Sequence, residues 1–251
     1  MKFSVLATGS KANCTYLEYQ GKALLIDCGL SAKRTLERLE TVGGKAQSIK
    51  AILLTHEHSD HIKGVSVLSR KLQIPVYANR ATARFLKNVY RVEHFNTGEE
   101  FVLDGFDILP FSIVHDAADP VGFTATAGGV KHVQLTDLGR ITTVVRSAIN
   151  DCNSILLESN YDQQRLHECP YPWKLKQRIS SSHGHLSNDD ASTFLSEISK
   201  NPINHVVLGH LSENSNTPEL AMATAAKFND FSRFKNLICG SVDHATPMMS
   251  S

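Results

Sequence analysis

The first 30 residues of the chain alternate short apolar runs with polar turns. Apolar runs of this length that lack a period of three to four residues are typical of buried β-strands. The pattern therefore predicts strands at residues 3–6, 14–19 and 23–26. Ser31 is suited to cap a helix over residues 31–42, and the pair Gly43-Gly44 is suited to end it.

The next segment joins a short apolar run to a helical stripe. Residues 51–54 have the length of a buried strand. Beyond residue 61, apolar residues recur every three to four positions, which marks one face of a helix: Ile62, Val65, Leu68 and Leu72. A short strand at residues 75–77 and a basic helix near residues 80–89 are expected to follow.

The rest of the chain repeats this order of strands followed by helices. Between residues 101 and 136, glycines stand where hairpin turns are needed, at Gly105 and Gly128-Gly129. Strands are predicted there at residues 101–103, 106–114, 122–126 and 130–135, and later at residues 154–158 and 205–208. Helices are predicted at residues 141–149, at 161–179 with breaks at Pro170 and Pro172, after Ser187, and from Pro218. The repeated order suggests two sheets packed face to face with helices outside, in one domain over residues 1–251.

Composition narrows the class of protein. Hydrophobic residues make up 41% of the chain and charged residues 20%, as in ordinary globular proteins, and the net charge of +1 supplies no global attraction to polyanions. The five cysteines are odd in number, widely spaced and without a CxxC pair, which favours a reducing cytosol over a disulfide framework. We find no apolar stretch long enough for a membrane span or a signal sequence, so we expect a cytoplasmic protein that does not contact membranes.

The strongest chemical signal is the stretch from Thr55 to His61, on the predicted strand-to-helix turn. It holds four residues of the metal-ligand type within six positions: His56, His58, Asp60 and His61. A tight turn can bring all four around one cavity. Imidazoles with a carboxylate suit zinc, manganese or iron. The alternative is a polar loop that is rich in histidine by chance.

Four more residues of the same types each follow a predicted strand: Asp27, His115, Asp137 and His210. Polar residues at one set of strand ends can converge on one edge of the sheets. Taken singly, each has a simpler explanation, as a hydrogen-bonded surface histidine or as an aspartate of a turn. Together with the stretch at residues 56–61, their recurrence favours a metal site.

At this point the sequence resembles the metallo-β-lactamase superfamily and, within it, the YycJ/WalJ group. The stretches that carry the resemblance include residues 8–13, 115–120, 158–162, 184–188 and 210–219, and Ala12 departs from the glycine that is more common in the group. The resemblance implies an αββα sandwich that holds two divalent metal ions. It implies that His56, His58 and His115 hold one ion, that Asp60, His61 and His210 hold the other, that Asp137 bridges both, and that Asp27 orients the histidine-rich loop by hydrogen bonds.

Two metal ions that share Asp137 favour phosphodiester hydrolysis by a metal-bridging hydroxide. We expect Asp60 and His185 to be catalytic, with His185 as the acid that protonates the leaving oxygen and His183 as the weaker candidate. His185 alternatively caps the helix that begins near Ser187. The resemblance implies 5′-to-3′ exonuclease activity, with DNA as the substrate.

Several residues are candidates for substrate contact: Ser10 and Asn13, with Thr8, in a turn rich in backbone donors; Glu158 and Asn160 after a strand; and Trp173 and Lys174 in an aromatic and cationic segment. A plain hairpin, a helix cap and a buried tryptophan are the respective alternatives. A basic ridge is a further candidate, formed by Arg80, Arg84, Lys87 and Arg91.

Two other functions fit the same residues. One is a hydrolase of a small molecule such as a cyclic phosphodiester, a thioester or a lactone. The other is a non-hydrolytic iron redox or metal-sensing protein, which the absence of a recognisable flavin-binding segment disfavours. The sequence leaves the native metal among zinc, manganese and iron, and it leaves the oligomeric state open.

Overall fold

Two seven-stranded sheets pack face to face in a computed structural model of the chain, which describes residues 1–198, 203–228, 230, 232 and 234–250. The first sheet has a parallel part, from β3 to β6, and antiparallel pairs at β1–β2, β2–β3 and β1–β14. Its strands lie in the order β14 (Met249–Ser250), β1 (Lys2–Ala7), β2 (Cys14–Tyr19), β3 (Lys22–Ile26), β4 (Ile49–Leu53), β5 (Val76–Ala78) and β6 (Val92–His94).

The second sheet is mixed in the same way. Its strands from β10 to β13 are parallel, and those from β7 to β10 are antiparallel. They lie in the order β13 (Asn236–Cys239), β12 (His205–Gly209), β11 (Ser154–Glu158), β10 (Val130–Leu135), β9 (Val121–Ala127), β8 (Phe106–Ser112) and β7 (Phe101–Leu103).

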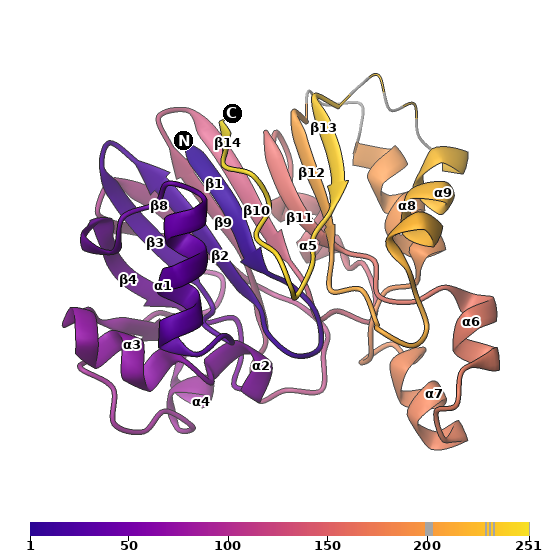
Figure 1. The fold of residues 1–251 in the computed structure, drawn as a ribbon, viewed down its shortest axis with the longest axis horizontal. Coiled ribbons are helices and arrows are strands. Elements are labelled where there is room, and N and C mark those ends of the chain that lie inside the picture. Colours follow the sequence, from indigo (N-terminus) through magenta and orange to yellow (C-terminus); the bar gives the residue numbers. More distant parts are fainter. Residues whose placement is uncertain (199–202, 229, 231, 233, 251) are drawn as a thin grey trace.

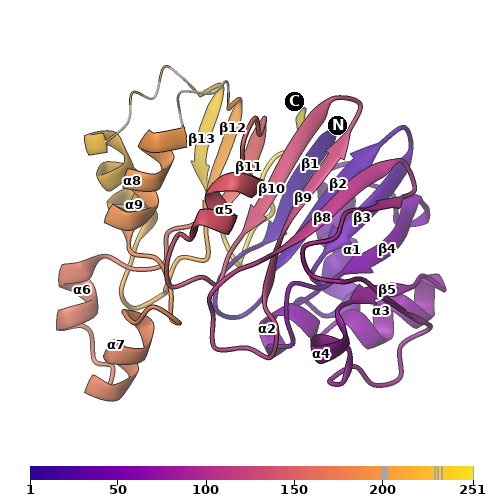
Figure 2. The ribbon, with the colours of Figure 1, turned by 180° about the vertical axis from the view of Figure 1, so that it is seen from behind.

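Helices cover the outer face of each sheet, which confirms the predicted αββα arrangement (Figures 1 and 2). The first sheet carries α1 (Ala32–Thr41), α2 (Ser59–Ile62), α3 (Val65–Leu72), α4 (Arg80–Ala83) and the 3₁₀ turn η1 (Ala46–Ser48). The second sheet carries α5 (Thr143–Ala148), α8 (Asn188–Ile198) and α9 (Pro218–Phe228). Two further helices, α6 (Gln163–Glu168) and α7 (Trp173–Ile179), project beyond the second sheet at one end of the molecule.

The central strands are buried on both faces, because one face packs against the other sheet and the opposite face packs against helices. Successive side chains therefore point into different apolar layers. In β1, Val5 joins the cluster between the two sheets, whereas Leu6 joins the cluster under the helices of the first sheet. In β12, Val207 faces the other sheet and Val206 faces the helices. Each fully buried side chain of this kind contributes about 1.5–3 kcal/mol, so the continuous apolar runs fix the four layers.

Three local predictions differ from the structure. The predicted helix after residue 61 is divided into α2 and α3 at Gly64, where a Cβ atom would lie 2.0 Å from the carbonyl oxygen of Leu30. The basic helix near residues 80–89 is limited to the single turn α4, and Phe85 beyond it is 51% exposed, so this segment lacks a buried apolar face. The sequence pattern does not indicate β6, β13 and β14, which are short strands at sheet edges and depend on pairing with a neighbour.

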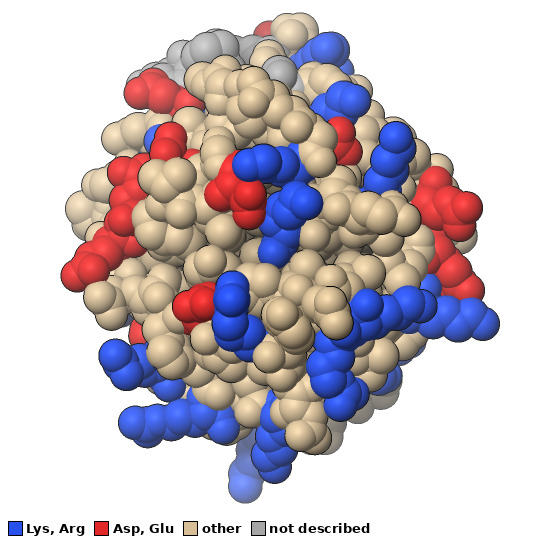
Figure 3. All heavy atoms as spheres, turned by 90° about the vertical axis from the view of Figure 1, so that its left-hand side faces the viewer, with Lys and Arg blue, Asp and Glu red and all other residues tan. Residues whose placement is uncertain are grey.

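The surface that carries α3 and α4 is rich in cations. Figure 3 shows lysine and arginine side chains gathered toward its lower edge. The four residues of the predicted basic ridge are all exposed. In the described residues, no helix is both long enough and apolar enough to cross a membrane.

Candidate metal centre

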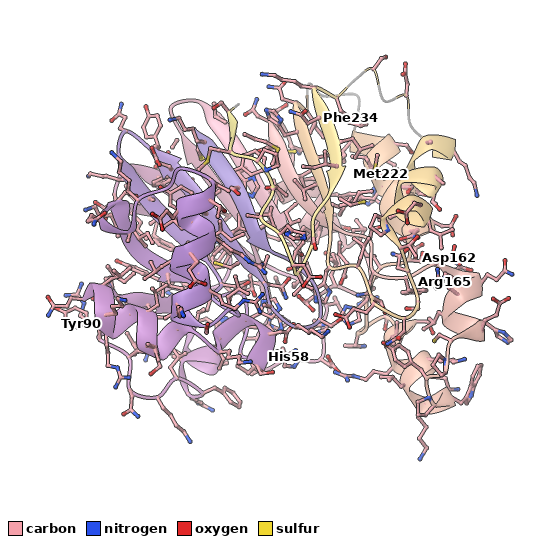
Figure 4. The ribbon with its side chains drawn as sticks, viewed as in Figure 1. His58, Tyr90, Asp162, Arg165, Met222 and Phe234 are labelled. Atoms are coloured by element: carbon pink, nitrogen blue, oxygen red, sulfur yellow. The ribbon has the colours of Figure 1, made fainter. Side chains whose placement is uncertain are left out.

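The parallel registers bring several strand ends to one level. Leu135 pairs with Leu157 and Glu158 pairs with Gly209, so β10, β11 and β12 end side by side. In the first sheet Ile26 pairs with Leu53, so the residues after β3 and β4 also meet. The polar residues that follow these strands therefore lie at one edge of the sandwich, at the end of the molecule where Figure 4 labels His58.

Three of the residues that follow strands adopt a left-handed backbone conformation. The φ angles are 61° at Asp27, 58° at Asp137 and 55° at His210. This conformation costs a residue with a side chain roughly 1–2 kcal/mol, and it turns the chain sharply as it leaves the sheet. Such strain persists where the surrounding structure enforces it, and it is concentrated at functional sites.

Backbone contacts hold the histidine-rich loop against the first sheet. The N–H of Asn13 donates to the carbonyl oxygen of Asp60 (2.8 Å), and the N–H of Cys28 donates to that of His61 (2.8 Å). At Gly29, a Cβ atom would lie 1.6 Å from the carbonyl oxygen of Asp60, so only glycine allows this approach. Backbone atoms thus hold the loop against the first sheet and leave its side chains available.

The structure brings all seven predicted metal ligands together, with Asp137 among the other six. One carboxylate oxygen of Asp137 lies 3.0 Å from His61 Nε2, and the other lies 3.5 Å from His210 Nε2 and 3.7 Å from His115 Nε2. Four groups have ligand atoms within 4.8 Å of one another: His56, His58 and His115; Asp60, His61 and His210; His56, His61 and Asp137; and Asp137, Glu158, His185 and His210. The first two groups match the two sets that the resemblance implied.

The donor atoms fit divalent cations. Among the described residues, the buried Nε2 atoms of His56 and His210 make no hydrogen bond. A buried polar atom without a partner costs about 1–3 kcal/mol, which a coordinated ion would offset. Imidazole nitrogens combined with the oxygens of Asp60 and Asp137 suit zinc, manganese or iron.

Asp27 lies beneath the loop and is fully buried. Its Oδ2 accepts from Nδ1 of His61 (2.8 Å), and its Oδ1 accepts from the backbone N–H of Thr55 (2.9 Å). Because Nδ1 of His61 is occupied in this way, Nε2 is directed toward Asp137. Asp27 thus has the contacts expected of a residue that orients the loop.

Glu158 is equally buried, beneath His185 and His210. Its Oε1 accepts from Nδ1 of His210 (2.7 Å) and from Nδ1 of His185 (2.8 Å). Its Oε2 accepts from the backbone N–H groups of Leu138 (2.9 Å) and Leu186 (3.2 Å). These contacts use both oxygens, so Glu158 orients two histidines rather than facing a substrate.

The electrostatics divide the histidines into two kinds. Burial lowers the pKa values of His56 and His115, which keeps these rings neutral and ready to coordinate. Burial also disfavours charge on His61 and His210, but neighbouring carboxylates outweigh it. Asp27 and Asp137 raise the pKa of His61, and Asp137, with Asp60 and Glu158, raises the pKa of His210. Metal binding must therefore displace protons from the second pair.

The carboxylates respond in the opposite direction. Burial by itself raises the pKa of Asp137, yet the nearby imidazoles, with His210 first and His61 next, hold it well below its usual range. Burial likewise raises the pKa of Glu158, and the contacts with His185 and His210 bring it to about 2. Both groups are therefore anionic at neutral pH and offer negative charge to a cation.

The two candidate acids lie in different places. His185 is partly exposed, and its Nδ1 lies 3.8 Å from Asp137 Oδ1. It does not cap α8, because the hydroxyl of Ser187 accepts from the N–H of Asp190 (3.1 Å) and takes that role. His183 is exposed, and its Nδ1 lies 3.1 Å from the hydroxyl of its neighbour Ser182.

The predicted substrate residues also separate. Asn13 is buried, and its amide donates to Asp60 Oδ2 (3.2 Å). Asn160 is buried, and its amide donates to the carbonyl oxygen of His210 (2.7 Å). Both therefore support the predicted ligands, while Ser10 is exposed. Trp173 is 63% exposed rather than buried, and it lines a hollow between α6 and α7.

Lys174 is exposed on α7. Two further residues, Asp116 and Arg178, lie beside the centre and were not among the predicted site residues. Asp116 Oδ1 lies 3.3 Å from His115 Nε2, and Asp116 Oδ2 accepts from Nε of Arg178 (2.6 Å). A usable signal was present, because Tyr171, Leu175 and Arg178 are spaced by four and three residues, as on one helical face.

A family model described as "Beta-lactamase superfamily domain" matches residues 22–211. Exodeoxyribonuclease WalJ of Streptococcus pneumoniae serotype 2 is 38% identical over 231 residues, which are 89% of this chain and 86% of that protein. Exodeoxyribonuclease YycJ of Bacillus anthracis is 34% identical over 235 residues, which are 90% of this chain and 88% of that protein. These similarities confirm the resemblance inferred from the sequence.

Solved structures show the same fold. The metallo-β-lactamase fold protein YhfI from Bacillus subtilis superimposes with a TM-score of 0.74 at 16% identity and covers 98% of both chains. The short form of human tRNase Z superimposes with a TM-score of 0.69 at 17% identity and covers both chains fully. At these identities the likeness concerns architecture alone.

Proposed function

This chain belongs to the metallo-β-lactamase superfamily and to its WalJ and YycJ group, and on that premise we propose that it is a metal-dependent exodeoxyribonuclease. Its reaction is the hydrolysis of phosphodiester bonds, in the 5′-to-3′ direction along DNA. The observation that carries the proposal is the meeting of seven imidazole and carboxylate side chains, Asp137 included, at a partly exposed edge of the two sheets.

We assign two divalent ions to the centre, from zinc, manganese or iron. His56, His58 and His115 would hold one ion, Asp60, His61 and His210 would hold the other, and Asp137 would lie between them. Such a pair of ions supplies an activated water and neutralises the charge on a phosphate. Because the proposed ligands come from both sheets, residues 1–251 would act as one catalytic unit.

The chain's own groups handle the protons. The Nδ1–H of His185 donates to Glu158, so its Nε2 is the nitrogen left to carry a proton to the departing oxygen. Asp60 is partly exposed, and its contacts with His210 and His61 outweigh burial and lower the pKa of its carboxyl, so it stays anionic and can orient the attacking water by accepting a hydrogen bond. We place the activity in the cytosol, where all five cysteines, which are free in the described residues, remain reduced.

The proposal is tested with DNA labelled at its 5′ or 3′ end, assayed on metal-loaded and on chelated protein. We expect stepwise release from the 5′ end by the loaded protein and no turnover by the chelated protein. Full turnover without metal would refute the proposal. Activity that is confined to thioesters, lactones or cyclic phosphodiesters would support a small-molecule hydrolase instead.

The role of His185 has its own test. We expect His185→Ala to lower turnover by about 10²–10⁴-fold, the usual contribution of a general acid, while metal content by elemental analysis stays unchanged. Loss of metal would make His185 a ligand, consistent with its distance from Asp137. Unchanged turnover would remove it from the mechanism.

A further inference from the structure

A cavity of about 230 Å³ lies beside the candidate metal centre. Its lining includes Ser10, Asp116, Tyr171, Leu175, Arg178 and His185. Asp116 also contacts His115, and His185 also approaches Asp137. The cavity therefore adjoins the proposed site of bond cleavage.

One side of the cavity is formed by a single face of α7 and of the residues just before it. Tyr171, Leu175 and Arg178 line it, whereas Trp173 lines a different hollow. Tyr171 and Leu175 are partly buried and pack against a small apolar cluster at the α6–α7 hairpin. This cluster is separate from the clusters of the two sheets. The hairpin thus presents an aromatic ring, an aliphatic side chain and a guanidinium to the centre.

The guanidinium of Arg178 is held in place by Asp116. Nε of Arg178 donates to one oxygen of Asp116 (2.6 Å), and the other oxygen lies 3.3 Å from Nε2 of His115. The Arg178 side chain is 57% exposed, and within the described part of the chain its two terminal nitrogens make no hydrogen bond. A planar guanidinium with free donors matches the oxygens of a phosphate.

The end of α7 packs against Gly184, which in turn contacts the candidate centre. At Gly184 a Cβ atom would lie 2.2 Å from the carbonyl oxygen of Arg178, so glycine permits this close packing. The carbonyl oxygen of Gly184 accepts from Nδ1 of His115 (3.1 Å). The hydroxyl of Tyr171 accepts from the amide of Asn214 (2.8 Å), which limits rotation of the ring. Arg178 is therefore held beside His115 through Asp116, and Tyr171 is held by Asn214.

We propose that this cavity binds one nucleotide of a single-stranded DNA end, next to the bond that is cut. The base packs on Tyr171 and Leu175, and Arg178 binds a phosphate adjacent to the scissile one. The cavity is smaller than the roughly 300–1,000 Å³ of ordinary ligand sites, so it suits one nucleotide rather than a base pair. This inference rests on the proposed function and adds its nucleotide-binding site.

Binding of a fluorescent, single-stranded, 5′-phosphorylated oligonucleotide to the metal-free protein in EDTA tests the proposal apart from catalysis. We expect Arg178→Ala to raise the Kd by about tenfold or more, because a charge-assisted contact to phosphate is lost. Arg178→Lys keeps the charge without the fork and should lie between the two. The matched control is Arg165→Ala, an exposed arginine on α6 of the same hairpin, which should change the Kd by less than about twofold (Figure 4).

The aromatic part is tested by a pair of variants. Tyr171→Ala removes the ring and should weaken binding by about tenfold, whereas Tyr171→Phe loses only the contact with Asn214 and should bind nearly as the wild type does. With metal present, the KM for DNA should rise in Arg178→Ala by a larger factor than kcat falls.

The outcomes separate the two proposals. If Arg178→Ala binds DNA as tightly as Arg165→Ala while the wild type still degrades DNA, the cavity does not hold the nucleotide, and the proposed function stands. Equal losses in Tyr171→Ala and Tyr171→Phe would also overturn the stacking role. A wild-type protein that neither binds nor degrades DNA would overturn both.

Discussion

The candidate centre has two halves, one carried by the first sheet and one by the second, and a buried carboxylate has the same local task in each. Asp27 accepts a hydrogen bond from Nδ1 of His61 (2.8 Å), and Glu158 accepts one from Nδ1 of His210 (2.7 Å). Both carboxylates are fully buried. In each half, the contact at Nδ1 directs the Nε2 of the histidine toward the shared Asp137.

The two halves differ in how they gather their side chains. Asp27 supports one loop, in which four predicted ligands lie within six residues, and its further contacts go to Thr55 beside that loop. Glu158 joins residues far apart in the chain, since His185 and His210 are 27 and 52 positions away. Sequence proximity gathers the first half, whereas a buried anion gathers the second.

The largest effect is expected where the two halves meet. Asp137→Asn keeps the shape of the side chain but removes its charge. The transition state should lose several kcal/mol of stabilisation, so turnover should fall by roughly 10³-fold. Elemental analysis should show fewer than two ions per chain. Retention of two ions with near-normal turnover would mean that the halves function without a shared carboxylate.

The same difference explains how far the sequence could predict the centre. The loop from His56 to His61 was readable because its residues are contiguous, and Asp27 was readable because it ends a strand. His115, Asp137 and His210 gained weight from their recurrence after predicted strands, and only the family resemblance divided them between two ions. Spacing alone does not report which strand ends become neighbours, because that depends on sheet order and register.

For two residues, Glu158 and Arg178, the contacts in the structure differ from those that the sequence pattern suggested. Glu158 ends a strand as a substrate-binding residue would, and only its complete burial between two imidazoles shows its orienting contacts. On α7 the sequence indicated the right segment but favoured Trp173, whose side chain is mostly exposed, over Arg178. The rotation of a short helix about its axis is set by packing against Gly184, which composition does not reveal.

A direct comparison of the two carboxylates gives the next largest effect. Asp27→Asn and Glu158→Gln should each lower metal affinity or turnover by about 10–100-fold, as is usual for residues that orient ligands. Glu158→Gln should be the more severe, because it loosens two histidines instead of one. Metal titration and turnover measured on both variants decide the order. A larger loss in Asp27→Asn would reverse our view of which half needs its carboxylate more.

A buried histidine without a carboxylate sharpens the comparison and carries the smallest effect. His132 in β10 contacts only the hydroxyl of Ser154 (3.0 Å) among side-chain hydrogen-bond partners in the described residues, and burial lowers its pKa to about 3. Between pH 3 and 6.5 the unfolded chain binds more protons at this residue than the folded chain, so its contribution to folding stability falls as the pH falls. The loss at pH 5 is about 1–2 kcal/mol.

Urea denaturation at pH 7 and pH 5 measures this effect, with the wild type and His132→Asn compared under chelation. The asparagine does not titrate, so the variant should lose less stability than the wild type on acidification. An equal loss in both proteins would show that His132 takes up a proton without penalty.

At Asp27, Asp137 and His210, the left-handed backbone opposes folding stability to catalytic activity within a single residue. Glycine would relax the chain at each of them and would abolish the side chain on which the reaction depends. A laboratory evolution campaign that rewards heat resistance alone should therefore drift toward glycine at these codons and yield sturdy, inactive protein. Keeping an activity screen in every round would hold the three residues in place.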